Sequence, residues 1–211
     1  MNLTELFDSS LHGRETETGL EFAGEEHTFR NLEVRGNRLA NRLAEDGLRP
    51  GDRVGVYLKN SVECIDLYLG AVKLGLIFVP LNVLYRTREI EPILADAEPK
   101  AVFTSADLED ELLPAMSGLE EPILYRVEDL YGLTRDQSTE RPSVRAEGGT
   151  PAAIVYTSGT TGRSKGAVLT HGNFAANARN LIAAWRMTQE DRLLLALPLF
   201  HVHGLGNGVH T

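Results

Sequence analysis

Strand-like and helix-like segments alternate between residues 53 and 104, and this alternation most limits what the chain can fold into. Residues 53–58 are short and β-prone, and residues 61–74 carry apolar side chains at helical spacing and end at Gly75. The pattern continues as a strand, a helix and a strand at residues 76–80, 87–97 and 100–104. Strands connected by helices predict parallel βαβ units with helices on both faces of a sheet, which is an α/β fold.

Residues with capping chemistry mark where two of the helices begin. Thr28 is a suitable N-cap for an amphipathic helix in which Leu32 and Leu39 share one face, and Gly47 follows as a stop signal. Thr87 is predicted to cap the helix at whose start it lies. The predicted order from Thr28 onward is therefore helix, strand, helix, strand, helix and strand.

A polar stretch at residues 136–150 divides the chain. Its composition, which includes Pro142 and the pair Gly148-Gly149, predicts a loop. Residues 28–135 then form a βαβ region, and residues 151–211 form a second region.

This second region is predicted to contain three strands and one helix. Residues 152–156 and 167–170 predict two strands that a glycine-rich loop connects. A helix is predicted from His171, with Trp185 packed in the core, and residues 193–197 predict the third strand.

The glycine-rich loop combines three kinds of group that bind phosphate. Its glycines let the backbone approach a ligand closely, its hydroxyls donate hydrogen bonds, and its two cations supply positive charge. The predicted phosphate-binding residues are Thr157, Ser158, Gly159, Thr160, Thr161, Gly162, Arg163, Ser164 and Lys165. The alternative is an exposed turn without a ligand, which the lysine spacing and the flanking strands make less favoured.

The loop does not follow the Walker pattern. Gly159 lies six residues before Lys165 as that pattern requires, but Ser164 replaces its second glycine and Gly166 replaces its Mg²⁺-binding hydroxyl. The residues after the loop also predict a strand, whereas a Walker loop opens a helix. The dinucleotide-binding pattern Gly-x-Gly-x-x-Gly does not fit these residues either.

Charge and hydropathy argue against several classes of partner. The net charge of −9, without a run of basic residues, argues against nucleic-acid binding. Neither a basic and apolar leader nor a run of about 18 apolar residues is present, so a soluble, cytoplasmic protein without a membrane partner is predicted. Cys64 is the single cysteine, which excludes an internal disulfide, and its apolar helical setting predicts a core residue instead of a nucleophile.

Several motifs resemble the adenylate-forming (AMP-binding) superfamily, which includes acyl-CoA synthetases, luciferases and the adenylation domains of peptide synthetases. Besides the loop, the similar motifs are Gly51-Asp52-Arg53-Val54, Asn60-Ser61-Val62-Glu63, Val79-Pro80-Leu81-Asn82 and Asp96-Ala97-Glu98-Pro99-Lys100. The loop, with Ser164 where many members carry proline, and residues 197–205 look most like malonyl-CoA synthetases. The resemblance covers about residues 28–211 and implies the parallel-sheet βαβ units of the large N-terminal domain of these enzymes.

The resemblance implies an ATP-dependent acid–CoA ligase. Such enzymes use ATP and Mg²⁺ to convert a carboxylic acid into acyl-AMP and pyrophosphate, and then pass the acyl group to the thiol of coenzyme A. Malonate or another small acid is favoured here. By this resemblance, residues 157–165 hold the β- and γ-phosphates, and His201 lies beside the acyl and adenylate site.

The remaining histidines support no metal site. His201 and His203 are two residues apart and lack a nearby third ligand, so no metal site is predicted in this chain and the Mg²⁺ ligand is expected outside it. His171 matches a family position after the loop, but the start of a surface helix explains it as well. No role is predicted for His12, His27 or His210.

Other motifs of the family do not occur in this sequence: the adenine-stacking segment with its Mg²⁺-binding Glu, the ribose-binding Asp, and the small carboxy-terminal domain with its catalytic Lys. Residues 1–211 are therefore interpreted as a truncated part of the N-terminal AMP-binding domain that is inactive alone. Its exposed strand edge and apolar faces are expected to reduce solubility unless another chain covers them. A missing carboxy-terminal portion or a complementing chain is the expected partner.

Two alternatives to this interpretation stay open. The first is a non-catalytic remnant that at most binds polyphosphate or a partner. The second is an adenylation domain that loads a carrier protein.

Overall fold

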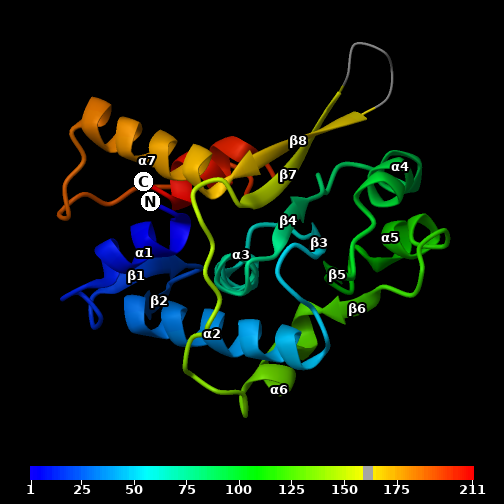
Figure 1. The fold of residues 1–211 in the computed structure, drawn as a ribbon, viewed down its shortest axis with the longest axis horizontal. Helices are drawn as coiled ribbons and strands as arrows, with labels where there is room; N and C mark the ends of the chain where they lie inside the picture. Colours follow the sequence, from blue (N-terminus) through cyan, green and yellow to red (C-terminus); the bar gives the residue numbers. More distant parts are fainter. Residues whose placement is uncertain (159–163) are drawn as a thin grey trace.

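A mixed six-stranded sheet lies at the centre of the computed structural model, which describes residues 1–158 and 164–211 (Figure 1). The strand order is β6-β5-β3-β4-β7-β8, and every neighbouring pair is parallel except β7 and β8. Its strands are β3 (Arg53–Tyr57), β4 (Ile77–Pro80), β5 (Ala101–Thr104), β6 (Ile123–Arg126), β7 (Pro151–Ser158) and β8 (Ser164–Thr170). The predicted α/β fold with parallel βαβ units is confirmed.

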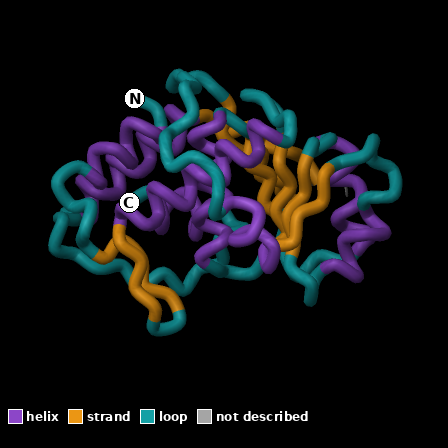
Figure 2. Tube along the Cα trace, turned by 90° about the horizontal axis from the view of Figure 1, so that it is seen from below, coloured by secondary structure: helices purple, strands orange, loops and turns teal. Residues whose placement is uncertain are grey.

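Helices surround the sheet and connect its parallel strands (Figure 2). The α-helices are α1 (Leu3–Leu11), α2 (Phe29–Glu45), α3 (Val62–Leu74), α4 (Thr87–Ala97), α5 (Glu109–Ala115), α6 (Leu130–Thr134) and α7 (His171–Trp185). A short 3₁₀ turn, η1 (Val127–Asp129), precedes α6, and a π-helix, η2 (His203–Val209), follows α7. In the part of the chain that the structure describes, no helix is long and apolar enough to cross a membrane.

Local capping chemistry explains where the helices next to β3 begin and end. Thr28 accepts a hydrogen bond from the amide of Asn31 at the start of α2, as the sequence predicts, and Ser61 does the same for Cys64 in α3. Gly75 ends α3 with a φ of 71°, a left-handed conformation that glycine adopts without strain.

The prediction that Thr87 caps α4 is wrong. Arg86 holds the N-cap position, and Thr87 is the first helical residue. The hydroxyl of Thr87 instead donates to the carbonyl of Glu111 in α5, at 3.0 Å. The Thr87 hydroxyl therefore connects α4 to α5 and does not cap its own helix.

The core lies on both faces of the sheet. Because successive side chains of a strand point to opposite faces, Val54 and Val56 of β3 pack with α2 and α3, whereas Tyr57 packs with α4. Gly55 faces α4 as well, where an added Cβ atom would lie 3.5 Å from Leu94. Parallel strands buried on both faces are typical of α/β proteins.

The predicted loop at residues 136–150 contains no helix or strand and is held across α2 by side-chain amides. Asn37 donates to the carbonyl of Thr139 at 2.8 Å, and Asn41 donates to the carbonyl of Glu140 at the same distance. Figure 1 shows this segment passing α2 on its way from α6 to β7.

An ion-pair network joins the same segment to three helices. Arg141 bonds the carboxylate of Asp8 at 2.5 and 2.9 Å and that of Glu33 at 2.9 Å. Glu33 also accepts a bond from the buried Lys73 at 2.7 Å. Burial alone would raise the pKa of Glu33, but Lys73 and Arg141 together lower it, so its carboxylate is charged at neutral pH.

Several elements were not predicted from the sequence. They include α1, whose Asn2 cap accepts from the amide of Glu5 at 2.8 Å, and a two-stranded antiparallel sheet of β1 (Thr18–Phe22) and β2 (Glu25–Thr28). Ala23 and Gly24 connect these strands with φ angles of 53° and 84°, a turn that usually carries Asn-Gly or Asp-Gly. The short elements α5, β6 and α6 were also missed.

The predicted strand at residues 193–197 is wrong. The segment is apolar, but no strand pairs with it in the described part of the chain, and Leu194 is 92% exposed. A strand needs a hydrogen-bonded neighbour as well as a suitable sequence. The only side-chain bond to this segment joins the amide of Asn60 to the carbonyl of Leu197, among the bonds recorded for residues 1–158 and 164–211.

We expect Arg141→Leu to lower the free energy of unfolding by about 1–2 kcal/mol. This value lies between those for an exposed and a buried ion pair, because Glu33 still has Lys73 as a partner and is not left as an unpaired charge. Arg145→Leu is the control, since Arg145 is an exposed arginine of the same segment. Urea unfolding of both variants measures the difference. Equal losses for the two arginines would contradict a specific role of the network.

Candidate phosphate-binding site

Strands β7 and β8 form an antiparallel hairpin whose ends flank the predicted phosphate-binding loop (Figure 1). Both strands are longer than the sequence predicts, because pairing continues through Tyr156 and Gly166, Thr157 and Lys165, and Ser158 and Ser164. The predicted ligand residues Gly159, Thr160, Thr161, Gly162 and Arg163 lie outside the described residues. Among the predicted ligand residues, the structure therefore describes the side chains of Thr157, Ser164 and Lys165, and the strand pairing of Ser158.

Thr157 and Lys165 form the pair of side chains next to the loop. Residues directly opposite each other in an antiparallel pair project from the same face, so the Thr157 hydroxyl and the Lys165 ammonium group belong to one side of the hairpin. Both residues are exposed, as a site for a charged ligand requires. The structure therefore brings a hydroxyl donor and a cation together beside the loop.

Gly166 of β8 leaves room for two side chains of β7, those of Ile154 and Tyr156. An added Cβ atom there would lie 2.7 Å from the Ile154 methyl group and 3.0 Å from the Tyr156 ring. Both distances are shorter than ordinary contacts, so a larger residue would push the ring away. Gly166 carries a packing requirement that the sequence alone did not reveal.

The site lies at the carboxyl edge of the parallel strands. β3, β4 and β7 run in the same direction, so Asn60, which follows β3, and the carboxyl end of β7 lie toward the same edge of the sheet. This edge is where ligands bind in open α/β sheets.

Asn60 connects the segment before His201 to this same edge. Its amide nitrogen donates to the carbonyl of Leu197 at 3.0 Å, and its amide oxygen accepts from the backbone of Leu199 at 2.8 Å. His201 follows two residues later, is exposed, and contacts the ring of Phe200 with centroids 4.8 Å apart. The sequence did not single out Asn60 for this role, because the contact joins residues 137 and 139 positions apart.

Two other histidines, His171 and His210, lie in the core. His171 is fully buried, and its Nδ1 accepts a hydrogen bond from the amide of Leu3 at 3.3 Å, so it is not a surface residue at the helix start. His210 is also buried and shares a 2.7 Å hydrogen bond with the hydroxyl of Tyr68. Helix α1, which the sequence did not predict, covers His171 and makes it a core residue.

Trp185 does not pack in the core, contrary to the prediction. It is the last residue of α7 and is 56% exposed. The buried face of α7 ends at Ala178, two turns earlier, so the helix extends beyond the core that it covers. Figure 1 shows this end of α7 pointing away from the sheet.

Neither a metal centre nor a reactive thiol is found among residues 1–158 and 164–211. No group of three or more His, Cys, Asp and Glu side chains could hold a metal ion there. Cys64 is 2% exposed, which confirms its predicted place in the core, and burial raises the pKa of its thiol to about 12. A neutral buried thiol is not a nucleophile at physiological pH.

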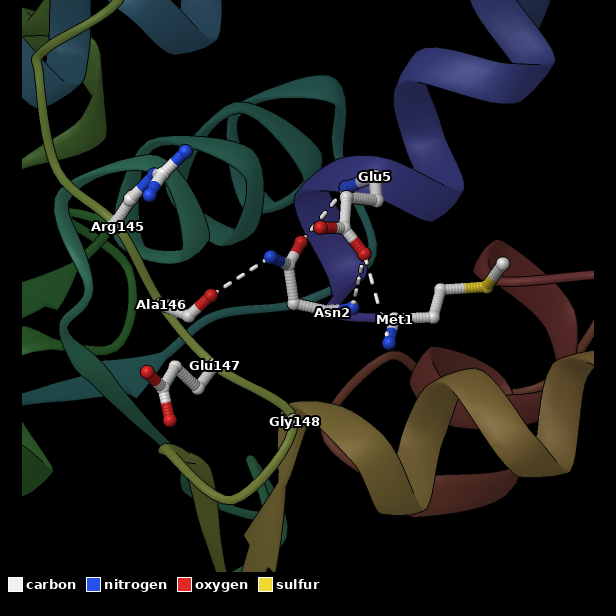
Figure 3. A pocket seen from close by; sticks show the side chains of 7 residues that line it. All are labelled: Met1, Asn2, Glu5, Arg145, Ala146, Glu147 and Gly148. Atoms are coloured by element: carbon white, nitrogen blue, oxygen red, sulfur yellow. Dashed lines mark hydrogen bonds and ion pairs between the residues drawn. The ribbon is translucent and has the colours of Figure 1, made fainter.

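The structure also has an open hollow of about 440 Å³ between α1 and the segment before β7 (Figure 3). It is lined by Met1, Asn2, Glu5, Arg145, Ala146, Glu147 and Gly148. Asn2 donates across it to the carbonyl of Ala146 at 2.7 Å. Because it lies at the start of β7, it is at the opposite end of that strand from the phosphate-binding loop, and we do not assign the site to it.

Sequence comparison defines the family. The profile of the family described as AMP-binding enzyme matches residues 7–210, so this chain belongs to the AMP-binding enzyme family.

Curated relatives show which activities occur at this degree of similarity. Sulfoacetate–CoA ligase from Cupriavidus necator is 35% identical over 190 residues, which make up 87% of this chain and 37% of that protein. The mitochondrial malonate–CoA ligase of Mus musculus is 34% identical over 86% of this chain and 32% of its own length. Long-chain-fatty-acid–CoA ligase FadD13 of Mycobacterium tuberculosis is also 34% identical, over 84% of this chain and 36% of its own. The chain spans less than half the length of these relatives.

Solved structures agree with the family assignment. Apo MatB from Rhodopseudomonas palustris matches with a TM-score of 0.88 and 34% identity, over 98% of this chain and 42% of that chain. The ATP-bound form of MatB matches with a TM-score of 0.85 and 35% identity, with the same coverage. The α/β fold described above is thus that of the N-terminal part of these enzymes.

The burial of His210 predicts a pH dependence of stability. Burial is the main cause that lowers its pKa to about 3, whereas an unfolded histidine has a pKa of about 6.5. Below about pH 6.5 the unfolded chain therefore binds a proton that the folded chain does not, and stability is lost as the pH falls toward about 3. Between about pH 7 and about pH 5, His210 is expected to lower the free energy of unfolding by about 2 kcal/mol.

His210→Gln tests this dependence, because glutamine keeps a hydrogen-bonding group for Tyr68 but does not titrate. Urea unfolding at several pH values should show a smaller acid-side loss for the variant. Parallel pH profiles for the two proteins would show that His210 does not titrate between the folded and unfolded states.

Proposed function

We propose that this chain supplies the polyphosphate-binding hairpin of an ATP-dependent acid–CoA ligase. The main support is the pairing of Thr157 with Lys165 beside the loop, at the carboxyl edge of a parallel sheet. The fold match to ATP-bound MatB and the names of the CoA ligase relatives support the same function. In this proposal residues 28–135 are the βαβ region, residues 136–150 are the connecting loop, and residues 151–211 are the phosphate-loop region of an N-terminal AMP-binding domain.

The hairpin acts in the first half-reaction. An oxygen of the substrate carboxylate attacks the α-phosphorus of ATP, the bond from that phosphorus to the bridging oxygen breaks, and pyrophosphate leaves. Thr157, Ser158, Ser164 and Lys165, with residues 159–163 between them, bind the β- and γ-phosphates by hydrogen bonds and charge. This binding orients the leaving group and stabilises the negative charge that it gains.

His201 belongs to the acyl and adenylate side of the proposed site. In the second half-reaction the thiol of coenzyme A attacks the acyl carbon, AMP leaves with the electrons of the broken bond, and the thiol proton is released. Asn60 bonds the segment before His201 and so keeps that segment close to the end of β3. His201 itself is exposed, so a bound acyl group or adenylate can reach it. Mg²⁺ accompanies ATP, and its protein ligand is expected outside residues 1–211.

The proposed acid is malonate or another small carboxylate. The motifs around the loop and residues 197–205 resemble malonyl-CoA synthetases, and two relatives are named for the small acids sulfoacetate and malonate. FadD13, at similar identity, is named for long-chain fatty acids, so identity at this level does not fix the acid. The choice of malonate therefore rests on the motifs.

The reading frame beyond codon 211 distinguishes this proposal from two alternatives, a non-catalytic remnant and a carrier-protein-loading adenylation domain. A frame that encodes the adenine, ribose and carboxy-terminal motifs supports the ligase, whereas a stop without an adjacent complementing gene supports a non-catalytic remnant. Downstream carrier-protein modules would instead support a loading adenylation domain.

We expect Lys165→Ala to weaken the binding of inorganic tripolyphosphate to the 211-residue chain about tenfold or more, because a charge-assisted contact contributes about 1.5–3 kcal/mol. Lys100→Ala is the control, since Lys100 is an exposed lysine at the start of β5, on the opposite edge of the sheet from the loop. Isothermal titration measures both affinities, and circular dichroism checks the fold. Equal affinities for wild type and folded Lys165→Ala would refute the phosphate-binding role.

The product of the complete reading frame should catalyse carboxylate-dependent exchange of pyrophosphate into ATP. We expect the highest kcat/KM with malonate in a panel that also contains methylmalonate, acetate and a long-chain fatty acid, and no exchange with the 211-residue chain alone. Exchange with the long-chain acid only would contradict the small-acid proposal, and exchange by the 211-residue chain would contradict the expected need for the remaining motifs.

A further inference from the structure

The half of the hairpin that carries the loop has little support from the rest of the sheet. β7 pairs with β4 at a single position, between Ala153 and Phe78, and then continues to Ser158 with only β8 beside it. Residues 164–168 of β8 are exposed. An isolated two-stranded ribbon is at best marginally stable in water, so a further contact is needed to fix the outer half of the hairpin, which carries Thr157 and Lys165.

Helix α4 provides that contact through Tyr156. The Tyr156 hydroxyl donates a 2.5 Å hydrogen bond to a carboxylate oxygen of Asp96, which lies in the last turn of α4. Ile154 projects from the same face of β7, and both side chains pack against the core cluster that includes α4. Figure 1 shows the hairpin extending beside α4.

The hairpin sequence accommodates this arrangement. Gly166 is the cross-strand partner of Tyr156, and its missing side chain leaves room for the tyrosine ring. Burial of the ring and the neighbouring Asp96 both raise the pKa of Tyr156, so its hydroxyl stays protonated and donates at neutral pH. Tyr156 is also directly followed in the chain by Thr157, the first predicted phosphate ligand.

We propose that Tyr156 and Asp96 are positioning residues for the Thr157–Lys165 pair, because their hydrogen bond holds the outer half of the β7–β8 hairpin against α4. This inference rests on the proposed function, in which the loop binds polyphosphate. Neither residue contacts the ligand. Their effect on binding is indirect, through the fraction of molecules in which Thr157 and Lys165 are held in their cross-strand pair.

The structure offers a matched control on β6, the outermost strand on the other side of the same sheet. Tyr125 of β6 also donates its hydroxyl to a carboxylate, that of Asp46, and its ring stacks on Phe103 with centroids 4.7 Å apart. In the strand order, β6 is at one side of the sheet and the β7–β8 hairpin is at the other. Tyr125→Phe therefore removes the same type of bond from the same sheet without touching the hairpin.

The first test compares Tyr156→Phe with Tyr125→Phe in the 211-residue chain. We expect Tyr156→Phe to increase amide hydrogen exchange in residues 164–170 about fivefold, the effect of losing one ordinary hydrogen bond. Its affinity for inorganic tripolyphosphate should fall by up to about fivefold, because the bond acts only through the fraction of molecules in which the hairpin is held. Tyr125→Phe should change neither quantity. Wild-type exchange and affinity in Tyr156→Phe, or equal changes in both variants, would overturn the proposal.

A second test asks whether the two residues act through one bond. Asp96→Ala should reproduce the effect of Tyr156→Phe, and the double variant should show no further loss, because each single change already removes the bond. Asp96→Asn should restore part of the exchange protection, since an amide oxygen still accepts from the hydroxyl. Additive losses in the double variant would show that Tyr156 and Asp96 act separately, contrary to the proposal.

The two readouts separate this inference from the proposed function. If the wild-type chain does not bind tripolyphosphate, the proposed function fails, and with it the role of the bond in ligand binding. Hydrogen exchange then still decides whether Tyr156 and Asp96 hold the hairpin. If the wild type binds tripolyphosphate and Tyr156→Phe binds it equally well, the proposed function stands and the positioning role is refuted.

Discussion

Parallel pairing of β3 with β4 and β5 determines where everything else in this chain lies. Strands that run in the same direction must be joined by crossovers, so α3 and α4 cover opposite faces of the sheet and bury β3 between two core clusters. The same direction of travel places the ends of β3, β4 and β7 at one edge. Asn60, which follows β3, therefore lies toward the same edge as the carboxyl end of β7.

The β7–β8 hairpin departs from this regular pattern and carries the chemistry. β8 is antiparallel to β7 and exposed through most of its length, so hydroxyl and lysine side chains can face solvent. A loop on such a hairpin gains access to a charged ligand but loses support from the core. The hydrogen bond from Tyr156 of the hairpin to Asp96 of α4 supplies part of that support.

Local chemistry was enough to predict much of the βαβ region. The Thr28 cap and the helix end at Gly75 act within a few residues and were predicted from the sequence. The predicted cap at Thr87 was wrong, because its hydroxyl bonds Glu111 of the distant helix α5. Burial and pairing depend on distant partners and were harder to predict. A surface position was left open for His171 because nothing local indicates that α1 covers it. Residues 193–197 were assigned to a strand because their composition does not show whether a neighbouring strand exists.

The candidate site divides in the same way. The hydroxyls and cations of the loop and its two flanking strands were predicted from the sequence, because residue types and spacing define them. Tyr156, Asp96 and Asn60 were not assigned to the site, since their bonds join residues at least 60 positions apart. Gly166 was noted as a glycine, but its packing against Tyr156 could only be found in the folded hairpin.

Chemical labelling of lysines in the wild-type chain tests the central claim most directly. The sequence contains four lysines, and Lys59, Lys100 and Lys165 are exposed while Lys73 is buried, so the chain carries its own controls. Acetylation rates are measured by mass spectrometry with and without inorganic tripolyphosphate at constant ionic strength. If the hairpin binds polyphosphate, tripolyphosphate slows acetylation of Lys165 and leaves Lys59 and Lys100 unchanged. Unchanged acetylation of Lys165 at saturating tripolyphosphate, or equal slowing of all three exposed lysines, would contradict the account.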